Sequence, residues 1–242
     1  MREEHRGRES GRTLGVFARP RSARRPRRVE VQQDVRRVAF AGVVEVGAPR
    51  QVYVDARLRG IAWRKQRLVV DSEHVSWGGK SVLFDQVTAL AYWATGTALA
   101  RGCEIELCAG MKRTHIAFRA RDEVKYDVFK RTIAALQTHV ERRLVGELLA
   151  AVAAGEQVEA ASLRLSRAGL GVGRSQVPWA AIVAVQPPAW RNPKVLTGDL
   201  LVYARGERGD VKPFAHIFFS QPNGVLLPAL IQACAAQYSA GL

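Results

Sequence analysis

Short apolar runs separated by turn residues fill two stretches of the chain. The first comprises RQVYVDARL at 50–58, RLVVDSEHVSWGGKSVLFDQVTALAYW at 67–93, CEIELCA at 103–109 and RTHIAF at 113–118. The second comprises QVEAASLRLSRAGLGVGRSQVPWAAIVAVQ at 157–186, GDLLVYAR at 198–205 and PFAHIFF at 213–219. Alternating apolar and polar positions between turns are typical of antiparallel strands, so we expect two β-meanders.

A helical pattern follows each meander. Between about residues 122 and 154, apolar side chains recur three and four residues apart, as on one helix face: Phe129, Ile133, Leu136, Val140, Leu144 and Leu148. This helix is too long to close one small domain, so we expect a break or bend between His139 and Gly146. A final helix is expected from about Asn223, with Pro228 in its first turn, where a missing N–H is tolerated.

The two stretches also match one another. A shift of 95 residues places 68–90 on 163–185 without a gap and pairs Phe84 with Trp179. HIAF at 115–118 recurs as HIFF at 216–219, and the helical positions recur at a shift of 98, which pairs Ile133 with Ile231. Three matches in the same order indicate an internal repeat, and we expect both residue pairs to occupy equivalent core positions.

A glycine-rich segment, AGLGVGRSQVPW at 168–179, lies inside the second meander. A dinucleotide-binding loop needs a strand before its glycines and a helix N-terminus after them. Here the strand-like SQVPWAAIVAV follows, and the spacing is GxGxG instead of GxGxxG. We therefore expect a tight turn between strands.

Together these patterns predict an α+β fold of two tandem β-barrels, each closed by a C-terminal helix. The expected boundaries are a disordered tail at 1–28, a lead-in at 29–49, a first half at 50–140, a helical connector at 141–155 and a second half at 156–242. Meanders that end in one amphipathic helix resemble the PH-like fold.

The second half most resembles a bacterial family known only as a domain of unknown function. The resemblance rests on GEQVEAASLRLSRAGL, VPW and QPN, with matching positions at Gly155, Val158, Ser166, Gly169, Leu170, Pro178, Trp179, Pro222 and Asn223. It implies tandem PH-like halves and no activity. PH-like domains bind lipid head groups or peptides, and the lipid-binding ones carry a basic signature in their first hairpin. We take DSEH at 71–74 and SRAG at 166–169 as the corresponding turns, where that signature is missing.

Positive charge is concentrated at the N-terminus. Residues 1–37 contain twelve arginines and five acidic residues, whereas the chain as a whole has a net charge of +15. A charged, proline-containing segment with few apolar residues is expected to be disordered. Three interpretations remain for it: a solubilising tail, a stretch upstream of the true start site, or an arm for anionic partners. No apolar run reaches the roughly 20 residues of a membrane span, so we expect a cytoplasmic protein, with a possible place at the inner membrane face.

Residues suited to catalysis or metal binding are sparse. Cys103, Cys108 and Cys234 lack CxxC spacing, and we expect them to be reduced thiols. His115 and His216 occupy equivalent places in the repeat, on the strand face opposite to the apolar residues. Because no nucleophile with a base, paired carboxylates or phosphate loop is evident, we expect no enzyme activity, cofactor, metal or small-molecule substrate.

Three functions remain. The first is an intracellular binding or scaffold module that recognises a protein or peptide. The second is a peripheral membrane protein that binds anionic lipid head groups through basic loops and the tail. Nonspecific nucleic-acid binding is the third and is not favoured, because cations and aromatic residues do not interleave on one strand. The candidate anion-contacting residues are Arg24, Arg25, Arg27, Arg28, Lys80, Lys112, Arg113, Arg174, Arg191 and Lys194.

Overall fold

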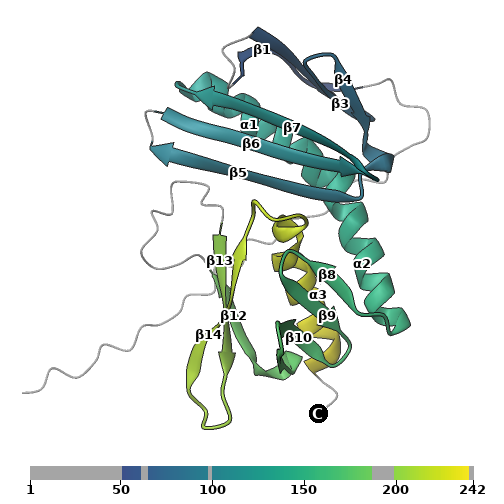
Figure 1. The fold of residues 1–242 in the computed structure, drawn as a ribbon, viewed down its shortest axis with the longest axis vertical. Helices are drawn as coiled ribbons and strands as arrows, with labels where there is room; N and C mark the ends of the chain where they lie inside the picture. Colours follow the sequence, from purple (N-terminus) through teal and green to yellow (C-terminus); the bar gives the residue numbers. More distant parts are fainter. Residues whose placement is uncertain (1–50, 61–64, 98–99, 187–198, 240–242) are drawn as a thin grey trace, which may run out of the picture. The chain divides into compact units, whose positions relative to one another are not determined.

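Antiparallel strands make up most of the fold, as the alternating sequence pattern predicts. The computed structural model describes residues 51–60, 65–97, 100–186 and 199–239. The expected tail and lead-in lie outside these residues. The described part is a mixed α+β structure of two successive halves, with helices at the end of each (Figure 1).

The first half contains two sheets whose strands follow sequence order. The first sheet is formed by β1 (Val52–Arg59), β2 (Lys65–Asp71), β3 (His74–Trp77) and β4 (Lys80–Leu83). A 3₁₀ turn, η1 (Phe84–Gln86), leads into the second sheet, formed by β5 (Ala89–Thr97), β6 (Ala100–Ala109) and β7 (Lys112–Ala120). The helix α1 (Glu123–Leu136) follows and contacts strands of both sheets.

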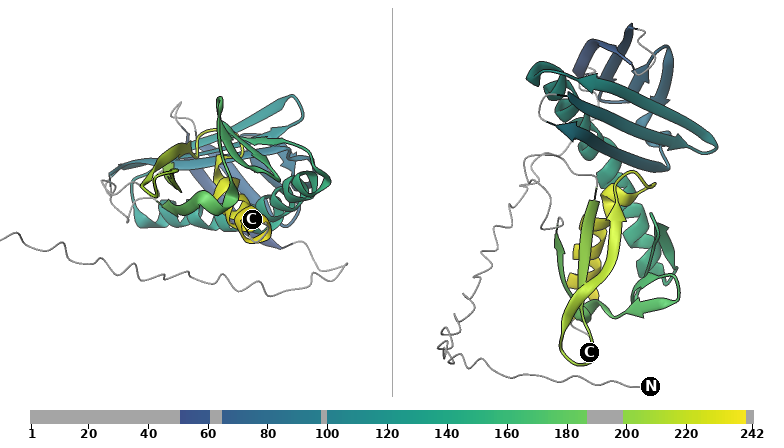
Figure 2. Two further views of the ribbon diagram at one scale, coloured as in Figure 1. Left: turned by 90° about the horizontal axis from the view of Figure 1, so that it is seen from below. Right: turned by 60° about the vertical axis from the view of Figure 1, so that its left-hand side comes forward.

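The second half repeats this order. One sheet contains β8 (Val158–Ala160), β9 (Leu163–Ser166), β10 (Gly169–Val172) and β11 (Ser175–Val177). After η3 (Trp179–Ala181), the other sheet contains β12 (Ile182–Gln186), β13 (Asp199–Arg205) and β14 (Val211–Phe218). The turn η4 (Gly224–Leu226) then leads into α3 (Leu227–Tyr238), which lies between the two sheets (Figure 1 and Figure 2). Pro228 stands in its first turn, as predicted.

No closed barrel forms among the described strands. They make four separate antiparallel sheets, of four and three strands in each half. Among the described residues of the first half, an isolated antiparallel bridge between Gly60 and Phe118 joins the end of β1 to β7. The sheets therefore meet at one corner, and this corner brings residues far apart in the sequence together.

The residues paired by the repeat occupy the same places in the two halves. Phe84 begins η1 and Trp179 begins η3, and both are at least 96% buried, with exposed fractions of 4% and 2%. Ile133 on α1 and Ile231 on α3 are buried as well. The prediction that Trp179 is a core residue is confirmed, and its indole N–H donates to the Ser166 carbonyl oxygen at 2.9 Å.

The long helical pattern is interrupted without being broken. α1 continues into a π-helical segment, η2 (Gln137–Glu141), and then into α2 (Arg142–Ala154). The interruption begins two residues before the predicted range, and its wider turn is closed by the Arg142 N–H, which donates to the Gln137 carbonyl oxygen. α2 ends at Gly155, whose φ of 95° is the left-handed conformation common after helices.

Residue spacing explains the π-helical segment. Leu136, Val140, Leu144, Leu148 and Val152 stand four residues apart, and all are buried or half-buried. In an α-helix each step of four residues turns about 40° past a full circle, so such a row drifts around the helix. Bonds to the fifth residue wind the backbone less per residue and offset this drift. The same row of apolar residues is therefore buried along both helices. α1 contacts the sheets of the first half, and α2 contacts β8 and α3.

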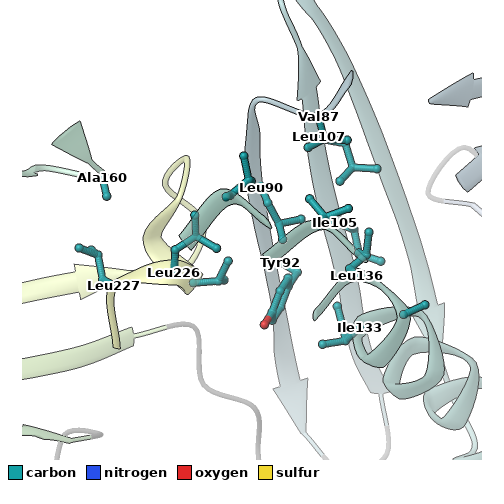
Figure 3. Close-up of a cluster of buried hydrophobic side chains, with 14 of the residues drawn as sticks. Val87, Leu90, Tyr92, Ile105, Leu107, Ile133, Leu136, Ala160, Leu226 and Leu227 are labelled. Atoms are coloured by element: carbon teal, nitrogen blue, oxygen red, sulfur yellow. The ribbon is translucent and has the colours of Figure 1, made fainter. Parts of the chain in front are cut away.

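The halves share an apolar junction at β5. Leu226 of the second half lies toward Leu90 of the first, whereas Leu227 lies farther from β5, on the side of Ala160 (Figure 3). Leu90, Leu226 and Leu227 are completely buried. Asn223 closes the junction, because its N–H donates to the Leu90 carbonyl oxygen at 2.8 Å and its side-chain oxygen accepts from the Leu90 N–H at 3.1 Å.

The glycine-rich segment is a β-hairpin, as predicted. Gly169 and Gly171 lie in β10, and Gly173 with Arg174 forms the two-residue turn to β11. Gly173 has a φ of 54°, which glycine adopts freely at such turns. A 3₁₀ turn follows β11 where a dinucleotide site needs a long helix.

Candidate anion-binding sites

The first hairpin of the chain is strongly basic on its outer face. In β1, Val54 and Leu58 are buried, whereas Arg57 and Arg59 point to the other face and are exposed. Strand register places Lys65 of β2 opposite Arg59. This hairpin corrects the interpretation of DSEH and SRAG as first-hairpin turns: 71–74 joins β2 to β3 and 166–169 joins β9 to β10. The first hairpin of the first half is thus β1–β2, which carries Arg57, Arg59 and Lys65.

Two more basic segments reach the same place. Because the Gly60–Phe118 bridge holds the end of β7 against β1, Arg119 and Arg121 lie next to the hairpin. They flank Ala120, which is buried, so both arginines are exposed. Lys125 in the first turn of α1 adds a further cation.

These side chains line a hollow of about 270 Å³, which we call the arginine hollow. Its lining residues are Arg57, Arg59, Gly60, Lys65, Arg119, Arg121 and Lys125. Of these seven described residues, six are cationic and none is a carboxylate. Arginine forks and lysine ammonium groups arranged in this way are suited to phosphate oxygens.

Carboxylates near the arginine hollow are already engaged. Arg67 holds Asp55 through two bonds, of 2.8 and 2.5 Å, and this hydrogen bonding lowers the pKa of that carboxyl. Asp122 caps α1 by accepting the Lys125 N–H at 2.8 Å and also pairs with the Lys125 ammonium, so its pKa is lowered too. The carboxylates stay ionised at neutral pH and neutralise part of the charge around the hollow.

Sequence reasoning did not predict the arginine hollow, because its residues form no recognisable motif in the sequence. They come from β1, β2, the end of β7 and the start of α1, and the outermost two, Arg57 and Lys125, are 68 positions apart in the chain. The only local signal is the alternation R-L-R at 57–59 and R-A-R at 119–121, which places two arginines on one strand face in each case.

A second basic surface contains three of the residues predicted to contact anions. Lys80 begins β4 after the Gly78–Gly79 turn, and Lys112 and Arg113 begin β7 after the turn that contains Met111. They line a hollow of about 450 Å³ with Ser81, Val82, Gln86, Ala109 and Thr114. We call the two turns with Lys80, Met111, Lys112 and Arg113 the turn surface. Arg113 pairs with Glu106, a buried carboxylate on β6.

Of the other predicted anion contacts, only Arg174 belongs to the described residues, and it lies apart in sequence from both surfaces. Arg174 is exposed on the turn between β10 and β11 in the second half. Arg24, Arg25, Arg27, Arg28, Arg191 and Lys194 lie outside the described residues. The described first half, up to residue 140, has thirteen lysines and arginines against nine acidic residues, whereas the second half from residue 156 has six against five. Positive charge in the described part of the chain is therefore concentrated in the first half.

The two equivalent histidines point outward, as predicted, and each meets a carboxylate. His115 Nε2 lies 3.1 Å from Glu104 Oε2, and His216 Nε2 lies 2.8 Å from Asp199 Oδ2. In both halves the acid is on the neighbouring strand, two positions before the residue directly opposite the histidine. Glu104 and Asp199 are themselves 95 positions apart, so the repeat preserves a pair of interacting residues.

Cysteine chemistry is suppressed by burial. Cys103 and Cys234 are completely buried, and this burial raises the pKa of Cys103 to about 12 and that of Cys234 to about 11. Cys108 is half-buried, and its pKa is raised for the same reason. All three are free thiols, which at neutral pH are protonated and poor nucleophiles. Within the described ranges, no group of three or more potential ligands is placed to hold a metal ion.

His139, in the π-helical segment, is expected to make the folded state of the first half less stable as the pH falls. Its ring stacks on Phe84 and its Nε2 lies 2.8 Å from the Tyr53 hydroxyl, and burial lowers its pKa. The unfolded chain therefore takes up this proton first as pH falls below about 6.5, and stability is lost from there down to the lowered pKa. Burial raises the pKa of nearby Glu141. The folded state therefore takes up the Glu141 proton first as pH falls, and this increases stability and offsets part of the loss from His139. We expect the drop in melting temperature between pH 7 and 5 to be smaller in His139→Gln than in the wild type. Equal drops in the two proteins would contradict this role.

Comparisons of the whole chain with protein-family models, with curated proteins and with solved structures give no match.

Proposed function

We propose that this protein is a non-catalytic binding module made of two PH-like halves, and that its first half binds a phosphate-bearing anion in the arginine hollow. The single observation that carries the proposal is that six of the described residues lining this hollow are cationic and that none of the described lining residues is a carboxylate. We further propose a cytoplasmic location, which the three free thiols support.

The order of elements supports a duplicated PH-like architecture. Each half has a four-stranded meander, a 3₁₀ turn that begins with a buried aromatic residue, a three-stranded meander and a helix. Phe84 and Trp179 take the same place in this order, as do the two histidine–carboxylate pairs. A duplicated ancestral domain accounts for all three equivalences.

The chemistry of the arginine hollow favours phosphate over a single carboxylate. Arginine donates two parallel hydrogen bonds to phosphate oxygens, and several arginines around one cavity suit a ligand with more than one negative charge. Among the described residues of its lining there is no histidine, cysteine or serine to act as base or nucleophile, which supports binding without catalysis. A phosphorylated segment of a partner protein and a lipid head group both present this group.

Binding of inorganic tripolyphosphate tests the proposal. We expect the full chain to bind it at constant ionic strength, and the double variant Arg57→Gln, Arg119→Gln to bind at least about 150-fold more weakly, since charge-assisted bonds contribute about 1.5–3 kcal/mol each. The matched control is Arg205→Gln, Arg208→Gln, which removes the same charge from exposed positions of the second half. Isothermal titration calorimetry measures the affinities. Equal losses in the two double variants would show a nonspecific charge effect and overturn the assignment.

Further titrations of the same kind distinguish a lipid head group from a phosphorylated peptide as the natural source of the phosphate group. A soluble inositol phosphate and a phosphorylated peptide are compared with inorganic phosphate. Binding of all three, lost together in the arginine variant, supports recognition of the group itself, whereas a preference for one of them identifies the ligand class.

A further inference from the structure

We propose that the turn surface docks the first half onto an anionic membrane, with Met111 entering the lipid interface and Lys80 and Lys112 contacting the head groups. This surface shares no residue with the arginine hollow. The inference therefore goes beyond the proposed function and does not depend on it.

The apolar side chain of Met111 is not packed against any of the described residues. It is fully exposed, at 105% of the reference area, whereas the next most exposed large hydrophobic residue in the described ranges, Val124, is at 77%. It stands in a two-residue turn after Gly110, whose φ of 57° accommodates the tight reversal. A polar residue serves a solvated turn equally well, so the fold does not account for a methionine here.

The charges around Met111 match an anionic surface. Lys112 follows it directly, and Lys80 reaches the same hollow from the neighbouring turn. Within the described part of the chain neither lysine forms an ion pair, whereas Arg113 is paired with Glu106. An apolar tip beside unpaired cations is the usual composition of interfacial membrane contacts, because burial of the tip and attraction to anionic lipids add.

The turns are held firmly enough to present these residues together. Gly78 and Gly79 have φ values of 58° and 83°, the conformation that closes a tight hairpin between β3 and β4. The Thr88 N–H donates to the Cys108 carbonyl oxygen at 2.7 Å, which fixes the base of the β6–β7 hairpin beside the segment after η1. Little ordering is needed on docking, and this favours binding.

Distance separates the turn surface from the arginine hollow. Lys112 begins β7 and Ala120 ends it, so the two sites stand at opposite ends of the strand, roughly 27 Å apart at the usual rise per residue. Substitutions at one site are therefore expected to leave the other unaffected.

Vesicle cosedimentation of the full chain tests the membrane proposal. The probes are phosphatidylcholine vesicles with and without phosphatidylserine. We expect binding to the anionic vesicles, weakened roughly 30-fold in Lys80→Gln, Lys112→Gln, since each basic residue near such a surface contributes about a factor of five. Met111→Ser is expected to weaken binding roughly tenfold through lost apolar burial. Two matched controls, Arg205→Gln with Arg208→Gln and the exposed Val211→Ser, are expected to bind as the wild type.

The outcomes decide the proposal. Retained tripolyphosphate binding by the turn-surface variants, together with lost vesicle binding, supports two separate sites. Equal vesicle binding by the lysine variant and its control overturns the docking surface, as does equal binding to neutral and anionic vesicles or none at all. If Met111→Ser binds like Val211→Ser, insertion of the methionine is overturned. Tight binding of duplex DNA that depends on the two lysines and not on Met111 assigns the surface to nucleic acid instead.

Discussion

Replacing Trp179 by alanine is expected to destabilise the protein by about 3–5 kcal/mol, the usual cost of removing a large buried aromatic side chain. Trp179 is 2% exposed, begins the 3₁₀ turn between the two sheets of the second half and donates a hydrogen bond to Ser166. Its loss leaves a cavity and an unsatisfied carbonyl oxygen in the same place. Equilibrium denaturation in urea measures the change in the free energy of unfolding.

Trp179→Phe is the matched control for this prediction, because phenylalanine stands at the equivalent place of the first half as Phe84. It keeps an aromatic ring and loses the indole N–H, so we expect a clearly smaller loss of stability than for alanine. An unchanged midpoint for Trp179→Ala would contradict a core role of the tryptophan in the second half.

Replacing Gly169 by alanine is expected to cost at least about 3 kcal/mol, the sum of backbone strain and a steric clash. Gly169 has a φ of 150°, which side chains with a Cβ rarely adopt. A Cβ at this position collides with the carbonyl group of Val177 and lies 3.0 Å from the Pro178 Cα. These are backbone atoms of the adjoining strand, so no side-chain rotation relieves the contact.

Gly171→Ala is the control two residues along the same strand. A Cβ at Gly171 meets only the Arg164 side chain, at 3.5–3.6 Å, which is ordinary contact. We expect its unfolding free energy to stay within about 1 kcal/mol of the wild type. The two variants therefore test whether these alternate glycines differ in role. Equal midpoints in thermal denaturation would refute the steric account of Gly169.

Local patterns were enough to predict most elements of this fold. Alternation and turn residues identified β1 through β14 in outline, because most of these strands have one buried face. The repeat identified Phe84 and Trp179 as equivalent core residues before any contact was known. The prediction of closed barrels was not confirmed, because closure depends on hydrogen bonds between sheet edges, and a sequence pattern does not report these bonds.

The two candidate sites also differ in whether local sequence patterns or pairings between distant segments determine them. Lys80 and Lys112 were predicted because each follows a turn, and turns expose charged residues wherever they lie. The arginine hollow was missed because it depends on the strand register of the first hairpin and on the bridge between Gly60 and Phe118. Without these pairings the RLR and RAR segments are two ordinary strand faces, 60 positions apart.

The π-helical segment Gln137–Glu141 limits how this gene can change in length. Loss or gain of one codon between Glu123 and Ala154 would turn every later residue of the helix by about 100° and shift it by about 1.5 Å. Leu144 and Val152, both buried, would then leave the core that they share with the rest of the second half. Only insertions close to whole turns, of about seven or eleven residues, restore the phase. Relatives of this protein should therefore vary in length at their hairpins while keeping the length of this helix.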